Sequence, residues 1–269
     1  MITNGINNNY TVIHTTTNEP MMPVRLYYKI HNEDLLVRAL KKLKCIGFEN
    51  KRNFVLLYYK EAKHLDLEVY YQDIPEECYP VILATGCIKQ GSILHLDLKS
   101  LQRAVCIIDF LGKHIPQTIM EITSFAHSNK FTVIHNRQEI QALLNQNFDH
   151  IFLDSKIHNV NHMINLNDEV GTRRLSSSSD QAMVNESLEM FMPYVEEDIA
   201  NYPEFERISI HYNRQKHDNL IVWLSIRAVI KELVATAHYE GNNNYSSKDA
   251  LNELFIMLNY DLNPNKNEG

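Results

Sequence analysis

The chain has 269 residues, 44% of them hydrophobic and 22% charged, and a formal net charge of −7 at pH 7. This composition is typical of a globular protein and excludes collagen-like, coiled-coil and fully disordered chains. No apolar run reaches the roughly 18 residues of a transmembrane helix, so no membrane insertion is expected. The negative charge argues against a dedicated duplex-DNA-binding protein, and Met1–Asn9 lacks the pattern of a signal peptide.

The N-terminal part predicts a tail, a strand and a helix in that order. Residues 1–22 are polar and rich in Asn and Thr, which indicates a flexible tail. Val24–Ile30 alternates so that one face is apolar and the other basic, as a half-buried strand does. Asn32 can cap the helix that follows, which carries an apolar stripe. Gly47 is the predicted signal for the end of this helix.

Two antiparallel hairpins are predicted next, because short polar or Gly-containing loops separate pairs of alternating segments. The hairpins are Phe54–Tyr59 with Leu65–Tyr71 and Val81–Ile88 with Ser92–Leu98. The second hairpin turns near Gln90-Gly91, and Gly86 within its first strand suggests a β-bulge.

The segment from Ser100 to Asp154 predicts alternating helices and strands. Ser100 can cap a helix that ends at Gly112, and Pro116 opens a short helical stretch to about Ser128. A strand, a helix and a strand then follow, a unit whose strands usually pair in parallel. These three segments are Phe131–His135, Arg137–Gln146 and Phe148–Asp154.

The C-terminal part predicts a loop followed by helices. Residues 155–180 are polar, include the serine run 176–179, and indicate a loop or linker. Residues 181–262 predict a helical region, and residues 263–269 a frayed tail. The expected helices are Gln181–Ala200, Asp218–Tyr239 and Ser246–Asn259, and the expected buried stripe is Leu220, Trp223, Leu224, Ile230 and Val234.

The fold class predicted from this order is α+β. It consists of a mainly antiparallel sheet with packed helices over residues 23–154, followed by a helical C-terminal region. The pattern leaves open whether these two parts form one domain or two.

The four cysteines, Cys45, Cys78, Cys87 and Cys106, form no CxxC pair and have no zinc-like spacing with histidine. Three of them have apolar neighbours, so we expect reduced thiols in a reducing compartment.

The composition is biased toward residues with AT-rich codons: 28 of the 269 residues are Asn and only 12 are Ala. In this general texture the chain resembles the uncharacterised open reading frames of red-algal plastids. The codon bias and this resemblance imply a location in the plastid stroma, with the cytoplasm as the alternative, and they imply no function.

Three tyrosine doublets on predicted strands suggest an RNA-stacking surface, because each doublet turns one ring outward. Residues 21–64 also hold 10 Lys or Arg against 4 Asp or Glu. The candidate nucleic-acid-binding residues are Arg25, Tyr27, Lys29, Arg52, Tyr59 and Tyr70. The alternative is ordinary sheet packing, in which Asp66 and Glu68 on a neighbouring strand neutralise Arg25 and Lys29.

A histidine group raises the alternative of a metal-dependent hydrolase or nuclease. His150, Asp154, His158 and His162 lie within 13 residues, and the last two would share one face of a helix. The HExxH pattern, however, needs Glu where Asn159 stands, so we predict no metal site.

Catalytic and nucleotide-binding signatures are missing from the sequence. It contains no GxSxG elbow, no GxxxxGK[ST] loop and no GxGxxG loop. We therefore expect no cofactor and predict a non-enzymatic binding or accessory factor.

An acidic segment offers a candidate interface for a protein partner. Residues 175–206 contain eight Asp or Glu and no Lys or Arg, and the densest part is Glu196, Glu197 and Asp198. Methionines interleave with these acids and could adapt to a partner surface. The simplest alternative is a solvated helix face.

Overall fold

The computed structural model describes residues 10–144, 147–153, 156–165, 203–211 and 217–261. Its strands are β1 (Thr11–Val12), β2 (Val24–Ile30), β3 (Ile46–Phe48), β4 (Asn53–Leu57), β5 (Ile82–Lys89), β6 (Ile93–Leu98), β7 (Met120–Ser128), β8 (Val133–Ile134), β9 (Ile157–Asn165) and β10 (Phe205–His211). Its α-helices are α1 (Glu33–Lys42), α2 (Leu101–His114), α3 (Glu139–Leu144), α4 (Phe148–Ile151), α6 (His217–Tyr239) and α7 (Ser247–Asp261). This combination confirms the predicted α+β class.

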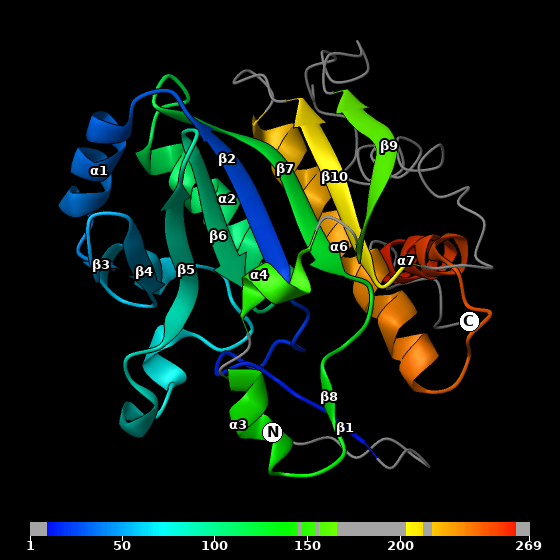
Figure 1. Ribbon diagram of the computed structural model, residues 1–269. Coiled ribbons are helices and arrows are strands. Elements are labelled where there is room, and N and C mark those ends of the chain that lie inside the picture. The colour runs from blue at the N-terminus through cyan, green and yellow to red at the C-terminus, as the bar shows by residue number, and fades with distance from the viewer. Residues whose placement is uncertain (1–9, 145–146, 154–155, 166–202, 212–216, 262–269) are drawn as a thin grey trace.

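Eight strands form one mixed sheet in the order β3-β4-β5-β6-β2-β7-β10-β9. Neighbouring strands within the sheet pair antiparallel, except β9 and β10, which pair parallel. Helices α2 and α6 cover one face of the sheet, and α4 lies on the other (Figure 1). The main core fills the space between the sheet and the covering helices.

Local end signals place several elements where the sequence predicts them. Asn32 accepts a hydrogen bond from the backbone of Leu35 at the start of α1. Ser100 accepts one from Arg103 at the start of α2. The β5–β6 turn contains Gly91 with φ of +81°, a conformation that suits glycine.

The predicted docking stripe of the long C-terminal helix is confirmed. Leu220, Trp223, Leu224, Ile230 and Val234 are all buried in the main core. This core also contains β2, β6 and α2 residues, so hydrophobic packing is continuous between residues 23–154 and the C-terminal helices.

The first predicted hairpin is not formed. Strand β4 pairs with β3 and β5, while residues 65–71 lie in a connection that contains short 3₁₀ turns. Tyr58 is buried beside this connection, and its hydroxyl donates to the Leu65 carbonyl oxygen at 3.3 Å. The apolar residues of this connection thus pack against the main core from a loop and not from a strand.

Other segments also differ from the predicted elements. The stretch after Pro116 forms the interior strand β7 and no helix, because its apolar residues pack on both faces of the sheet. Residues 148–151 form helix α4, where a parallel strand was predicted, and β8 pairs antiparallel with β1. Strands β9 and β10 lie in stretches predicted as a loop and as helical.

Residues 10–22, predicted as part of a flexible tail, are packed against the protein. Glu19 is fully buried, and its carboxylate lies 3.2 Å from the Arg103 guanidinium on α2. Arg103 also donates to Thr17 Oγ1 at 2.6 Å, so the segment is fastened by buried charge and hydrogen bonds.

Three glycines have roles other than those predicted. Gly112 does not end α2 but lies within it, because the helix continues to His114. Gly47 lies within β3, and α1 ends before it at Lys42. Gly86 forms no bulge: it is paired directly with Phe54 of β4, whose ring lies across it. A bare glycine is needed there because an added Cβ would meet the ring at 2.2 Å.

Candidate functional site

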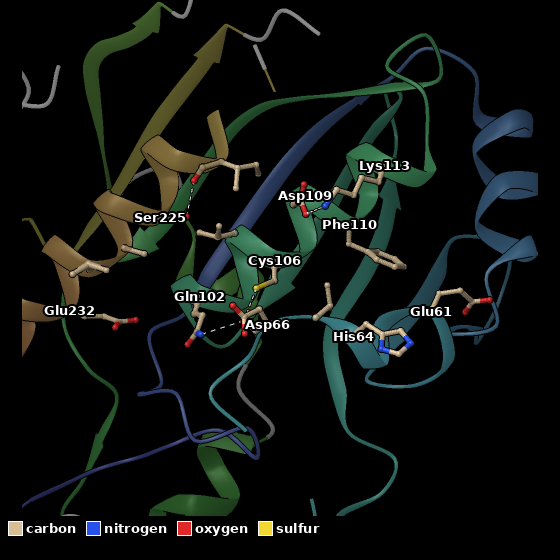
Figure 2. Close-up of a pocket in the computed structure, with 15 residues that line it drawn as sticks. Glu61, His64, Asp66, Gln102, Cys106, Asp109, Phe110, Lys113, Ser225 and Glu232 are labelled. Carbon is tan, nitrogen blue, oxygen red and sulfur yellow. Dashed lines mark hydrogen bonds and ion pairs between the residues drawn. The ribbon is translucent and has the colours of Figure 1, made fainter. Parts of the chain in front are cut away.

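A groove of about 720 Å³ is lined by α2, by α6 and by the segment after β4 (Figure 2). Its lining residues are Glu61, His64, Leu65 and Asp66 after β4; Gln102, Val105, Cys106, Asp109, Phe110 and Lys113 on α2; and Ile221, Ser225, Ala228, Val229 and Glu232 on α6. We call this feature the α2–α6 groove.

The groove exists because each helix uses its most apolar face against the sheet. On α2 this face includes Ile107 and Leu111, and on α6 it includes Leu224 and Val234. The flanks of the two helices therefore remain as groove walls. These flanks are themselves partly apolar, and Val229 is 40% exposed.

A buried charge network fixes the rotation of α6. Glu206 on β10 is fully buried, and it accepts hydrogen bonds from Arg227 at 2.6 Å and from Lys231 at 3.1 Å. Asn129 donates to the same carboxylate at 2.8 Å. Because Arg227 and Lys231 must face the sheet, the following positions Ala228 and Glu232 face the groove.

The electrostatics of this network are strongly perturbed. Burial opposes ionisation of Glu206, but the positive charges of Lys231 and Arg227 outweigh it and hold the pKa of Glu206 well below its usual range. Burial lowers the pKa of His127 to about 3, and its neutral ring lies 3.6 Å from Glu206. The network is closed to solvent, so we assign it a structural role.

Glu232 is the most unusual side chain of the α2–α6 groove. Its carboxylate points from α6 toward α2 (Figure 2). Within the described part of the chain it has no hydrogen-bond or ion-pair partner. Burial, together with the Glu19 and Glu68 carboxylates, raises the pKa of Glu232 to about 7.

The rest of the groove is also predominantly acidic. Glu61, Asp66 and Asp109 line it together with Glu232, against the single lysine Lys113. Lys113 is already paired with Asp109 at 2.5 Å along α2. The groove therefore offers negative charge to an incoming group.

The thiol and hydroxyl in the groove are not activated as nucleophiles. Burial raises the pKa of Cys106 to about 12, with the Asp66 and Glu19 charges adding to it, so the thiol stays protonated. Its Sγ donates to the Asp66 carbonyl oxygen at 3.3 Å. The Ser225 hydroxyl donates within its own helix, to the Ile221 carbonyl oxygen at 2.8 Å. These contacts suit binding more than covalent chemistry.

Two predicted nucleic-acid-binding residues are covered by other side chains. Arg25 is buried on β2, where it pairs with Asp97 on β6 and with Asp149 on α4. The Arg207 guanidinium lies 3.9 Å from the centre of the Tyr27 ring. The charge that faces Arg25 across the sheet is thus Asp97, and not Asp66 or Glu68 as the predicted hairpin would require.

The other four candidates are exposed but do not form one surface on neighbouring strands. Lys29 shares the outer face of β2 with Arg25 and Tyr27. Arg52, Tyr59 and Tyr70 lie in connections outside the strands. Tyr59 is covered in part by the Lys60 ammonium, 5.0 Å from its ring centre.

The predicted histidine pair has the wrong geometry for one metal ion. His158 and His162 lie on strand β9, where positions four apart are separated by roughly 13 Å along the chain. Asp154 lies outside the described residues. Among the described residues, no three His, Cys, Asp or Glu side chains are grouped to hold a metal.

The predicted acidic interface Glu196, Glu197 and Asp198, and the helix expected at Gln181–Ala200, lie outside the described residues. Glu206, at the end of the acidic segment, is buried in the core network and so does not contribute to a docking surface.

Sequence reasoning missed Glu232 because helical periodicity assigns a charged residue to the solvent side by default. One signal was present: Lys231 and Glu232 interrupt an otherwise apolar stretch of the longest helix. Opposite charges at adjacent helix positions point in different directions, and here one pairs in the core while the other enters the groove.

Comparison of the chain with protein-family models, with curated proteins and with solved structures finds no match. None of the helices in the described ranges combines the length and apolar character needed to cross a bilayer.

Proposed function

We propose that this chain is a binding protein whose α2–α6 groove takes a basic, amphipathic helical segment of a partner protein. The observation that carries the proposal is the unpaired Glu232 carboxylate in the groove. A neutral residue would be more stable at this position, because burial of an unpaired carboxylate is unfavourable. A cation from a partner would supply the missing counter-charge.

Charge complementarity favours a basic occupant. Four carboxylates line the groove and the one lysine among its lining residues is paired with Asp109. The chain's own acidic segment, residues 175–206, has no Lys or Arg and therefore carries the wrong charge. These charges favour a segment supplied by another protein.

The shape of the groove favours a helix as the occupant. Two helices form its walls, and the partly exposed apolar residues Val105, Ile221 and Val229 line it together with the carboxylates. A helix in such a groove can place apolar side chains at positions i, i+3, i+4 and i+7 between the walls. Its flanking Lys or Arg side chains would then reach Glu232 and Asp66.

Site-specific photocrosslinking can identify the occupant. A photoreactive residue would replace Val229 in the groove, and a matched control would replace Ile256 on α7, which is 64% exposed. We expect an adduct with one basic helical segment from position 229 and none from position 256. An adduct with an acidic segment, or equal labelling at both positions, would contradict the proposal.

The captured segment, made as a peptide, can then be titrated against variants. Glu232→Gln is expected to weaken its binding by about tenfold, equivalent to about 1.4 kcal/mol, and higher salt should weaken binding further. Glu240→Gln is the matched control, because Glu240 is exposed just beyond α6. Unchanged affinity in Glu232→Gln would exclude this carboxylate as the contact.

A further inference from the structure

A second charged cluster lies on the opposite face of the sheet, where α4 meets β2, β5 and β6. The Asp149 carboxylate of α4 is held by two cations from the sheet. Arg25 Nη1 lies 2.8 Å from one oxygen, and Lys89 Nζ donates to the other at 3.0 Å. We call Arg25, Lys89 and the neighbouring His95 the cationic niche.

The Arg25 guanidinium is oriented before any anion arrives. Its Nε and Nη2 donate to the two oxygens of Asp97 at 2.6 Å and 2.9 Å. Arg25 and Asp97 are directly paired residues on β2 and β6, so the strand register enforces this contact. The remaining nitrogen, Nη1, is thereby aimed at the position that Asp149 occupies.

His95 provides an unused donor or acceptor in the same place. It is paired with Tyr27 across β2 and β6, and its Nδ1 is buried without a hydrogen-bond partner. Burial, together with the positive charges of Arg25 and Lys89, lowers the pKa of His95 to about 4. At His95 the positive charges of Arg25 and Lys89 are thus opposed by the negative charge of Asp149.

We infer that the cationic niche is a phosphate-binding site in which Asp149 of α4 takes the place of the phosphate. Arginine N–H groups donate hydrogen bonds to the oxygens of a carboxylate and of a phosphate in the same way. A phosphate offers a third oxygen and more negative charge. His95, which interacts electrostatically with Arg25, Lys89 and Asp149, would lie next to the bound phosphate. The Asp149 side chain is 49% exposed, so an ion from solution can reach the niche.

This site involves none of the residues of the α2–α6 groove. A negative result in its test would therefore leave the proposed function untouched. Its ligand chemistry is a phosphate group, from either free phosphate or a single-stranded RNA. For a single-stranded RNA, the exposed Lys29 lies on the same face of β2 as Arg25 and offers a further cation.

Calorimetric titration of inorganic phosphate at constant ionic strength tests the inference. In Asp149→Asn the competing charge is removed, and phosphate should bind at least about tenfold more tightly than to the unmodified chain. Adding Lys89→Gln to that variant should abolish the gain. Asp109→Asn is the matched control, because it removes an aspartate that is also paired with one lysine but lies on the helix-covered face.

Equal phosphate affinity in Asp149→Asn and in the unmodified chain would overturn the inference. If Asp149→Asn fails to fold, the unmodified chain can be tested by NMR. Added phosphate should then shift the signals of the His95 ring, and unshifted signals would overturn the inference. An eight-nucleotide RNA that binds Asp149→Asn more tightly than inorganic phosphate identifies RNA as the source. Equal or weaker RNA binding identifies free phosphate.

Discussion

The Glu206 carboxylate accepts a hydrogen bond from Arg227 Nη2 at 2.6 Å, in a space between β10 and α6 that is closed to solvent. This contact joins the sheet to the helix that carries one wall of the α2–α6 groove. Lys231, one helix turn further on, contacts the other oxygen of the same carboxylate. The stability of the fold and the placement of the groove therefore depend on the same buried acid.

Replacement of Glu206 by Gln should destabilise the protein strongly. Arg227 and Lys231 would remain buried without their counter-charge, and breaking a buried ion pair costs about 3–5 kcal/mol. The free energy of unfolding in urea measures this loss. Glu204→Gln, an exposed acid two residues earlier, is the control. A loss smaller than about 1 kcal/mol would show that the network contributes little.

Replacement of Glu232 by Gln should have the opposite effect at pH 8. The pKa of Glu232 is about 7 in the folded protein, above its ordinary value of 4.5, so the folded state is penalised wherever the carboxylate is ionised. At about 1.4 kcal/mol per pKa unit, the gain at pH 8 should be about 3 kcal/mol. Unfolding at pH 8 and at pH 4 tests this, because almost no gain should remain at pH 4.

The buried histidines should make the protein sensitive to acid. The pKa of His127 is about 3 and that of His95 about 4, below the ordinary value of 6.5, so the unfolded chain binds more protons as the pH falls. Stability should decline from about pH 6.5 downward, by about 5 kcal/mol at pH 4.5 for both rings together.

Glu232 changes stability in the opposite direction between pH 7 and 4.5, so the acid decline should be measured in the Glu232→Gln variant. Urea unfolding at a series of pH values gives the curve. A free energy of unfolding that stays level from pH 6.5 to 4.5 would show that neither histidine is held neutral by the fold.

Replacement of Gly86 by Ala should destabilise the sheet through its contact with Phe54. The new Cβ would lie 2.2 Å from the ring, and such overpacking costs about 1–3 kcal/mol. Gly47→Ala on the nearby β3 is the control, because its Cβ would meet Val55 at an ordinary 3.4 Å.

The Gly86 contact can be isolated by a double-mutant cycle. Phe54→Leu removes the ring, so Gly86→Ala should be better tolerated in that background than in the unmodified chain. Thermal unfolding of the four proteins gives the coupling energy. Strictly additive effects would show that Gly86 is required for a reason other than the Phe54 ring.

Signals between near neighbours determined much of the secondary structure. Asn32 and Ser100 begin α1 and α2 as caps, and Gly91 turns the β5–β6 hairpin. The stripe of α6 from Leu220 to Val234 is buried as its spacing predicts. These signals act over about four residues, through a backbone hydrogen bond or a shared helix face, so they are legible in the sequence.

Only the tertiary structure decided the partners of those elements. Residues 65–71 alternate like a strand, yet β4 pairs with β5, because period-two alternation specifies a face and not a neighbour. The candidate sites depend on such distant pairings. Glu232 became a groove residue because Glu206 holds α6 by Arg227 and Lys231, and Asp149 reached Arg25 because α4 folded onto the outer face of the sheet.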